Sequence, residues 1–269
     1  MTTVLDSIVV GVREDLELRK SAVSLEVLRG LVQDASPAVD VARRLTTNTF
    51  NVISEVKRAS PSKGHLADIA DPAELAKQYE LGGAATISVL TEARRFNGSL
   101  ADLDSVRAAV QTPLLRKDFM VDEYQFWEAR AHGADMILLI VASLSDQQLS
   151  EYFALASELG MASLIEVHDE AELERALAIS PQIVGVNARN LKTLDVDLAT
   201  CHRVIPHIPK DVVAIAESGI STIEQVRELA ASGARGVLVG EALVTGGTPA
   251  QTVQEWTQAG AVQRELSKS

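Results

Sequence analysis

The chain has 269 residues, of which 46% are hydrophobic and 23% charged, ordinary values for a globular protein large enough to bury an extensive core. Its formal net charge of −12, and the lack of an apolar run of the ~20 residues that cross a bilayer, argue against binding to nucleic acid or membrane. The single cysteine, Cys201, excludes an intrachain disulfide, and the N-terminus has no basic secretory region, so we expect a cytoplasmic protein.

The first part of the chain, residues 3–48, has a helical pattern and precedes any strand. Two apolar-rich stretches, 4–12 and 25–32, lie within it. We expect these residues to form a helical extension that caps or flanks one end of the fold.

From about residue 50, short aliphatic runs alternate with helical patterns. The predicted strands are 51–57, 85–90, 114–117, 136–141, 162–167, 183–187, 212–217 and 236–239. The predicted helices between or after them are 72–81, 100–110, 123–132, 146–159, 170–179, 223–232 and 251–266, with helix-capping residues predicted at Asp71, Ser99, Asp122, Ser145 and Ser221.

Strands that alternate with helices indicate repeated βαβ units and a parallel sheet. Eight units favour closure into a (β/α)8 TIM barrel in the α/β class. The main competitor is an open doubly wound sheet, which predicts a G-x-G-x-x-G turn after the first strand. The segment Ser60-Pro61-Ser62-Lys63-Gly64 lacks that pattern. Because no linker interrupts the alternation, we predict one domain over residues 1–269.

Polar residues gather where these strands end, which is where barrel enzymes place their chemistry. Each residue alone is more often a solvated loop residue than a catalyst. Convergence of several charges on one barrel mouth is harder to explain by packing, because desolvating them is costly. The predicted set contains two i, i+2 pairs that share a face, Glu55 with Lys57 and Asn187 with Arg189, together with Lys117, Glu166 and Glu217.

Small residues follow the last two strands, at Ser218-Gly219 and at Gly240-Glu241. Barrels commonly bind phosphate there through backbone N–H groups. The histidines have no metal-binding spacing, and we interpret His132 and His168 as helix-end or loop residues. No serine lies in a G-x-S-x-G turn. We therefore expect neither a metal site nor a serine nucleophile, and we interpret Cys201 as a small core or helix residue.

These motifs resemble those of the indole-3-glycerol-phosphate synthase family. The most specific match is residues 53–64, ISEVKRASPSKG, which resembles the first-strand signature of that family. Further matches in family order are residues 88–92, 96–99, 115–119, 164–168, 185–191 and 217–220. One departure is Ala188, where the family more often has asparagine. Strand alternation predicts that its side chain points away from the site.

The resemblance implies a step of tryptophan biosynthesis that uses no cofactor. The small phosphorylated substrate, 1-(2-carboxyphenylamino)-1-deoxyribulose 5-phosphate, would be cyclised with loss of carbon dioxide and water. By similarity, Lys117 would be the general acid, and Lys57 and Glu166 would share the dehydration. Glu55 would orient the lysines. Substrate would contact Asn187, Arg189, Glu217, Phe96 and Phe119, and its phosphate would lie on Ser60, Ser218, Gly219, Gly240 and Glu241.

The residues leave two alternative functions open. A related phosphosugar isomerase would need a different acid–base pair, and a non-catalytic phosphate-binding barrel, acting as a pathway scaffold, would have lost a catalytic residue. Besides the small phosphorylated substrate, the partners that the resemblance implies are other enzymes of the tryptophan pathway, in a weak association.

Overall fold

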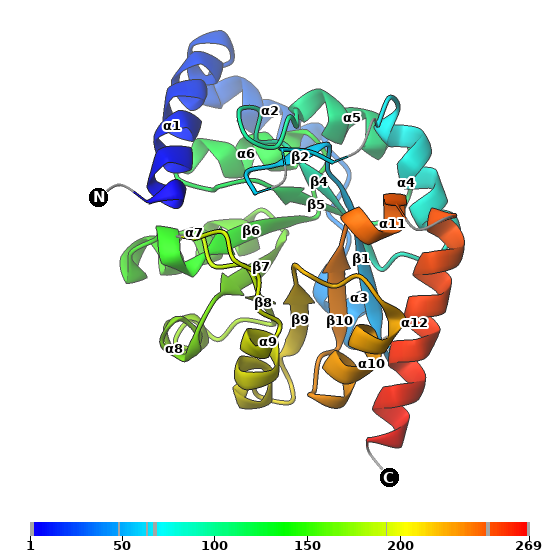
Figure 1. Ribbon diagram of the computed structural model, residues 1–269. Helices are drawn as coiled ribbons and strands as arrows, with labels where there is room; N and C mark the ends of the chain where they lie inside the picture. The colour runs from blue at the N-terminus through cyan, green and yellow to red at the C-terminus, as the bar shows by residue number, and fades with distance from the viewer. Residues whose placement is uncertain are drawn as a thin grey trace.

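The computed structural model describes residues 3–47, 49–62, 64–66, 69–191, 193–245 and 248–267. Its centre is a closed barrel of eight parallel strands in the order β1-β10-β9-β8-β7-β6-β5-β4 (Figure 1). The strands are β1 (Asn51–Val56), β4 (Thr86–Leu90), β5 (Leu114–Lys117), β6 (Met136–Ile140), β7 (Ala162–Val167), β8 (Ile183–Asn187), β9 (Val213–Glu217) and β10 (Gly236–Val239). The predicted TIM barrel is confirmed, and the predicted strand limits differ from these by a residue at most.

Helices surround the barrel and alternate with its strands (Figure 1). They are α4 (Pro72–Leu81), α5 (Leu100–Ala109), α6 (Tyr124–Ala131), α7 (Asp146–Glu158), α8 (Glu170–Leu177), α9 (Ala199–Val204), α10 (Ile223–Ala231), α11 (Glu241–Thr245) and α12 (Pro249–Leu266), with 3-10 turns η1 (Val141–Ser143) and η2 (Ile205–His207). Helix α12 contacts α4 and α10, the helices on either side of it.

Most predicted helix starts are correct, but two caps are not. Asp71, Ser99 and Ser145 each accept a backbone N–H at the start of their helix. The residue that caps α10 is Thr222 and not Ser221, because Thr222 and Gln225 form a reciprocal capping box. At α6 the N-cap position is Glu123, which makes no capping bond, while Asp122 accepts from the backbone of Tyr124.

The core has two layers. An outer layer lies between the strands and the surrounding helices and includes Val52, Val89, Ala188 and Cys201. An inner layer fills the barrel with side chains such as Leu115, Leu164 and Ile215. Both faces of the strands are buried along most of their length, which explains why apolar residues occupy both faces instead of alternating strictly with polar ones.

The N-terminal extension consists of α1 (Val4–Ala22), α2 (Leu25–Asp34) and α3 (Val41–Thr47). Leu5 and Ile8 of α1 line the cavity at the mouth of the barrel. Helix α3 lies at the opposite end, where Asn51 at the start of β1 donates to the carbonyl of Leu45. The extension therefore contacts both ends of the barrel, and not the single end that the sequence led us to expect.

One small element was not predicted. Strands β2 (Ala59–Ser60) and β3 (Gly64–His65) pair antiparallel in the loop after β1. Lys63, which belongs to the first-strand motif, lies outside the described residues. None of the described helices is long and apolar enough to cross a membrane.

Candidate active site

A cavity of about 380 Å³ opens at the carboxyl ends of the barrel strands, and this volume suits a small ligand. Every site residue predicted from the sequence lines it. They are Glu55, Lys57, Ser60, Phe96, Lys117, Phe119, Glu166, Asn187, Arg189, Glu217, Ser218, Gly219, Gly240 and Glu241. Residues from widely separated parts of the chain thus meet at one mouth, as the strand-end rule requires.

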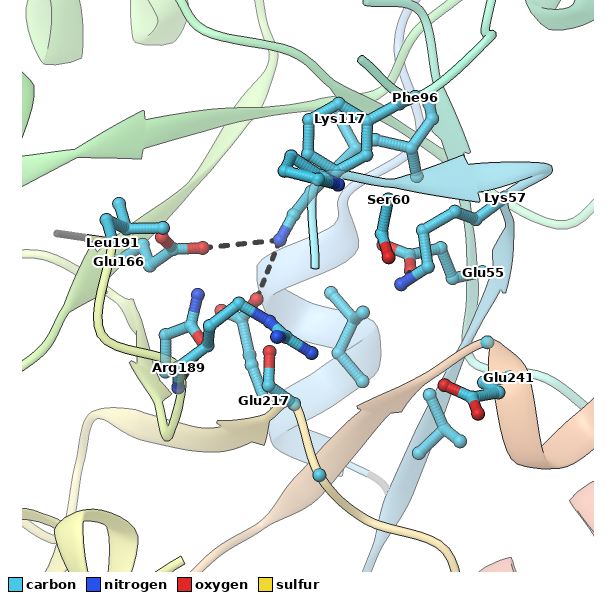
Figure 2. A pocket seen from close by; sticks show the side chains of 18 of the residues that line it. Glu55, Lys57, Ser60, Phe96, Lys117, Glu166, Arg189, Leu191, Glu217 and Glu241 are labelled. Atoms are coloured by element: carbon cyan, nitrogen blue, oxygen red, sulfur yellow. Dashed lines mark hydrogen bonds and ion pairs between the residues drawn. The ribbon is translucent and has the colours of Figure 1, made fainter. Parts of the chain in front are cut away.

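Lys117, at the end of β5, occupies the centre of this cavity (Figure 2). Its Nζ lies 2.7 Å from Glu217 Oε2 and 3.3 Å from Glu166 Oε2, and its side chain is 12% exposed. Burial disfavours the ammonium, but the charges of Glu217 and Glu166 outweigh that effect and raise the pKa of Lys117 above its usual value. Lys117 is therefore a buried ammonium held between two carboxylates.

The two carboxylates differ in their surroundings. Burial opposes ionisation of Glu166, but Lys117 and His168 together outweigh it and lower the pKa of Glu166. Burial raises the pKa of Glu217 to about 7, and the nearby charges of Glu166 and Glu55 add to this effect against the attraction of Lys117. Glu166 is therefore ionised at neutral pH, and Glu217 is poised to exchange a proton.

Strand β1 supplies a second ion pair to the cavity. Lys57 donates from Nζ to Glu55 Oε2, and the two side chains lie together in Figure 2. The Glu55 side chain is almost fully buried, whereas Lys57 remains partly exposed. The buried hydroxyl of Tyr79 donates to the Glu55 carbonyl at 3.1 Å and fixes the end of the strand from behind. Lys57 Nζ is thus oriented by a fixed carboxylate and faces the cavity.

The end of β8 places Asn187 and Arg189 in the cavity with Ala188 between them. The Arg189 backbone N–H donates to Asn187 Oδ1 at 2.9 Å, and its Nη1 donates to Ser62 Oγ at 2.7 Å. Ala188 is buried in the outer core layer, so the predicted direction of its side chain is confirmed. Alanine at position 188, where the family more often has asparagine, is therefore compatible with the hydrogen bond between Arg189 and Asn187.

One wall of the cavity is apolar. The rings of Phe96 and Phe119 have centroids 6.1 Å apart and planes inclined at 42°, a tilted aromatic pair. Leu5 and Ile8 of α1 extend this wall. The sequence analysis missed the contribution of α1, although the apolar stretch 4–12 was recognised. What the sequence could not provide was the position at which this helix docks.

The opposite wall is formed by the turns after β9 and β10. Ser218 and Gly219 both have positive φ, +68° and +74°, which turns the chain sharply at the end of β9. A side chain at position 219 would also collide with Val196, so glycine is required there. Gly240 and Glu241 lead from β10 into α11, and Ser60 of β2 lines the same cavity. Backbone turns of this kind suit an anionic group.

Sequence reasoning also missed His168, which we had interpreted as a loop residue. It follows β7 directly, and its Nε2 lies 3.4 Å from Glu166 Oε1. The sequence did contain a pattern that identifies His168, because Glu166 and His168 are an i, i+2 pair like those that pointed to Lys57 and Arg189. Among the described residues, no cluster of His, Cys, Asp and Glu side chains could hold a metal ion.

Comparison with known proteins points to a family. Residues 5–256 match the family described as indole-3-glycerol phosphate synthase. A relative of that name from Paenarthrobacter aurescens (strain TC1) is 57% identical over 264 residues, which cover 96% of this chain and 97% of that protein. Indole-3-glycerol phosphate synthase 1 of Streptomyces coelicolor is 55% identical over 258 residues, which cover 96% of each chain.

Among solved structures, the chain is similar to a thiamine phosphate pyrophosphorylase from Pyrococcus furiosus. The TM-score is 0.60 at 15% sequence identity, over 80% of this chain and 98% of that chain. At this identity the likeness concerns the fold alone.

Proposed function

The chain belongs to the indole-3-glycerol phosphate synthase family, and we propose that the residues around Lys117 carry out the reaction of that family. The reaction closes an indole ring on 1-(2-carboxyphenylamino)-1-deoxyribulose 5-phosphate with loss of carbon dioxide and water, which makes the enzyme a carboxy-lyase. The comparisons favour neither the isomerase nor the scaffold alternative.

The observation that carries the assignment of roles is the buried ammonium of Lys117 between Glu166 and Glu217. When the aromatic ring attacks the ketone of the substrate, negative charge develops on the ketone oxygen. A fixed ammonium in a site of low dielectric stabilises that charge and supplies the proton. Glu217, with its pKa raised to about 7, is placed to return a proton to Lys117.

Dehydration needs a base for the ring proton and an acid for the departing hydroxyl. Glu166 suits the base, because its lowered pKa keeps it ionised. Lys57 suits the acid, because its Nζ is oriented by Glu55 and faces the cavity from the other side. This division assigns the two roles that the sequence left open.

The apolar wall and the wall of backbone turns would bind different parts of the substrate. The aromatic ring would lie against Phe96 and Phe119, and the phosphate against Ser60, Ser218, Gly219, Gly240 and the backbone of Glu241. Asn187 and Arg189 would position the sugar hydroxyls. Because α1 helps to line the cavity, we propose that extension and barrel form one domain, and that this domain works in the cytoplasm.

The proposed function is tested by incubating the purified chain with the carboxyphenylamino-deoxyribulose phosphate. We expect indole fluorescence to rise and one carbon dioxide to be released for each product molecule, measured with substrate labelled at the carboxyl carbon. Rearranged product with its carboxyl group retained would point to an isomerase. Binding of the substrate without turnover would point to a scaffold. Either result from folded protein overturns the proposal.

A further inference from the structure

His168 lies behind the base Glu166 and is held there by a second carboxylate. Its Nδ1 lies 2.9 Å from Glu172 Oε2, and that same oxygen accepts the His168 backbone N–H at 2.9 Å. Glu172 is in the first turn of α8, where its own N–H donates to the capping Asp169. The ring is therefore fixed by the start of a helix and not by packing alone.

The other ring nitrogen faces Glu166. Nε2 lies at an ion-pair distance of 3.4 Å from Glu166 Oε1, and it is buried with no hydrogen-bond partner among the described residues. When Nδ1 donates to Glu172, a neutral ring would turn the bare lone pair of Nε2 toward a carboxylate. The doubly protonated imidazolium instead presents an N–H to each carboxylate. The geometry thus selects the charged form of His168.

We propose that His168 is a positioning residue for this reaction: as an imidazolium, it holds the Glu166 carboxylate ionised and aimed into the cavity opposite Lys117. His168 does not itself line the cavity, so it acts through Glu166. The proposal rests on the proposed role of Glu166 as a base. Glu166 then lies between two cations, with one oxygen toward each.

The charges around the ring support this assignment. Those that act on His168 are Glu166 of β7 and Glu172 of α8, and beyond Glu166 lies Lys117 of β5. Burial opposes the charged ring, but the two carboxylates outweigh burial and raise the pKa of His168 to about 10. The imidazolium therefore persists across the neutral range in which a free histidine loses its proton.

Two variants test the proposal. We expect His168→Asn to lower kcat roughly tenfold, because the Glu166 carboxylate loses the ring that aims it, and a displacement of about 1 Å can cost up to roughly 100-fold. KM should change less than about twofold, since the ring does not line the cavity. The low-pH limb of the kcat profile should move toward neutral pH. His132→Asn is the matched control, because His132 pairs with Asp104 at the surface.

Glu172→Gln gives the sharper test, because it keeps the acceptor oxygen for His168 but removes the charge that favours the imidazolium. The kcat of Glu172→Gln should be close to that of wild type at pH 6, where the ring is still protonated. At pH 9 it should be close to that of His168→Asn. Loss of activity at high pH alone is not expected from a merely structural role. If His168→Asn does not fold, the pH profile of Glu172→Gln by itself tests the proposal.

Wild-type pH profiles in both variants would overturn the proposal, as would a loss of activity that is the same at every pH. A nitrogen-15 NMR titration of the His168 ring gives a readout that does not need turnover. We expect the wild-type ring to remain doubly protonated above pH 8, and a neutral ring at pH 8 would overturn the inference. Absence of turnover in wild type would instead count against the proposed function.

Discussion

At the scale of single residues, the site concentrates charge where burial makes it costly. Glu55, Glu166 and Glu217 are each less than 5% exposed, and they surround two lysines. Buried ion pairs contribute little net stability, because desolvation cancels much of their attraction. Their value lies instead in shifted pKa values, which catalysis by acids and bases requires.

The raised pKa of His168 predicts how stability depends on pH. Because the folded pKa of about 10 exceeds the unfolded value of about 6.5, His168 contributes stability fully below pH 6.5. That contribution is lost as the pH rises toward 10. The free energy of unfolding of wild type should therefore exceed that of His168→Asn by more at pH 6 than at pH 9.5, by on the order of a few kcal/mol.

Denaturant unfolding of both proteins at the two pH values measures this difference. His132→Asn is the control, because it removes a histidine whose exposed pair with Asp104 should contribute no more than about 1 kcal/mol. A difference between wild type and His168→Asn that is constant from pH 6 to 9.5 would contradict the assigned imidazolium.

Residue-scale prediction from sequence succeeded where strand alternation was applied and failed where it was not. The i, i+2 rule placed Glu55 with Lys57 and Asn187 with Arg189. The same rule applied to Glu166 selects His168, which adjacency to Asp169 had led us to discount. No sequence rule identifies Glu172 as its partner, since that contact depends on how the first turn of α8 begins.

At the scale of elements, the strands make room for one another's side chains. Gly185 on β8 pairs with Glu166 on β7 and with Ile215 on β9. A Cβ atom at position 185 would overlap Glu217 Oε1 and approach Leu164 Cδ1 to 3.1 Å. The missing side chain of β8 therefore creates the space that the carboxylate of β9 occupies beside Lys117.

Gly185→Ala should consequently displace Glu217 and lower kcat by up to roughly 100-fold, since a displacement of about 1 Å can have that effect. The backbone of Gly185 does not have positive φ, so alanine is conformationally allowed and the barrel should still form. Steady-state kinetics and circular dichroism check both parts.

Gly30→Ala in α2 is the matched control, because nothing lies within 4 Å of its added Cβ. It should leave kcat unchanged and stabilise the helix by about 0.5–1 kcal/mol. Wild-type kcat in folded Gly185→Ala would show that Glu217 does not need its present position.

Element-scale prediction was best for long periodic segments. The strands and the longer helices were predicted within about two residues of their limits. The short helices α9 and α11 were missed, because five or six residues are too few to display a helical period. The hairpin β2–β3 was missed for a similar reason, since two-residue strands carry no alternation.

At the scale of the whole molecule, a buried network connects the N-terminal extension to the strand that carries Lys117. Arg116 of β5 is fully buried and donates to Asp118 Oδ2 at 3.0 Å, and it lies 2.9 Å from Glu128 Oε2 of α6. Arg19 of α1 reaches the same Glu128 at 2.8 Å. Helix α1 is thus fixed both to the cavity and to the far side of β5.

This arrangement could not be read from the sequence. Arg116 lies beside Lys117 in the chain, but alternation sends the two side chains to opposite faces of β5, and only tertiary packing supplies the partners of Arg116. The barrel itself was predictable, because eight βα units leave few ways to bury a parallel sheet.

The central claim is that Lys117 supplies the proton for ring closure, and the most direct test compares Lys117→Ala with Lys77→Ala. Lys77 is an exposed lysine on α4 that does not line the cavity, and it serves as the matched control. We expect indole fluorescence at the wild-type rate from Lys77→Ala. Lys117→Ala should fold, still bind substrate, and lose at least roughly 100-fold in kcat, the usual contribution of a general acid. Near-normal turnover by Lys117→Ala would contradict the account, because the ring would then close without the ammonium between Glu166 and Glu217.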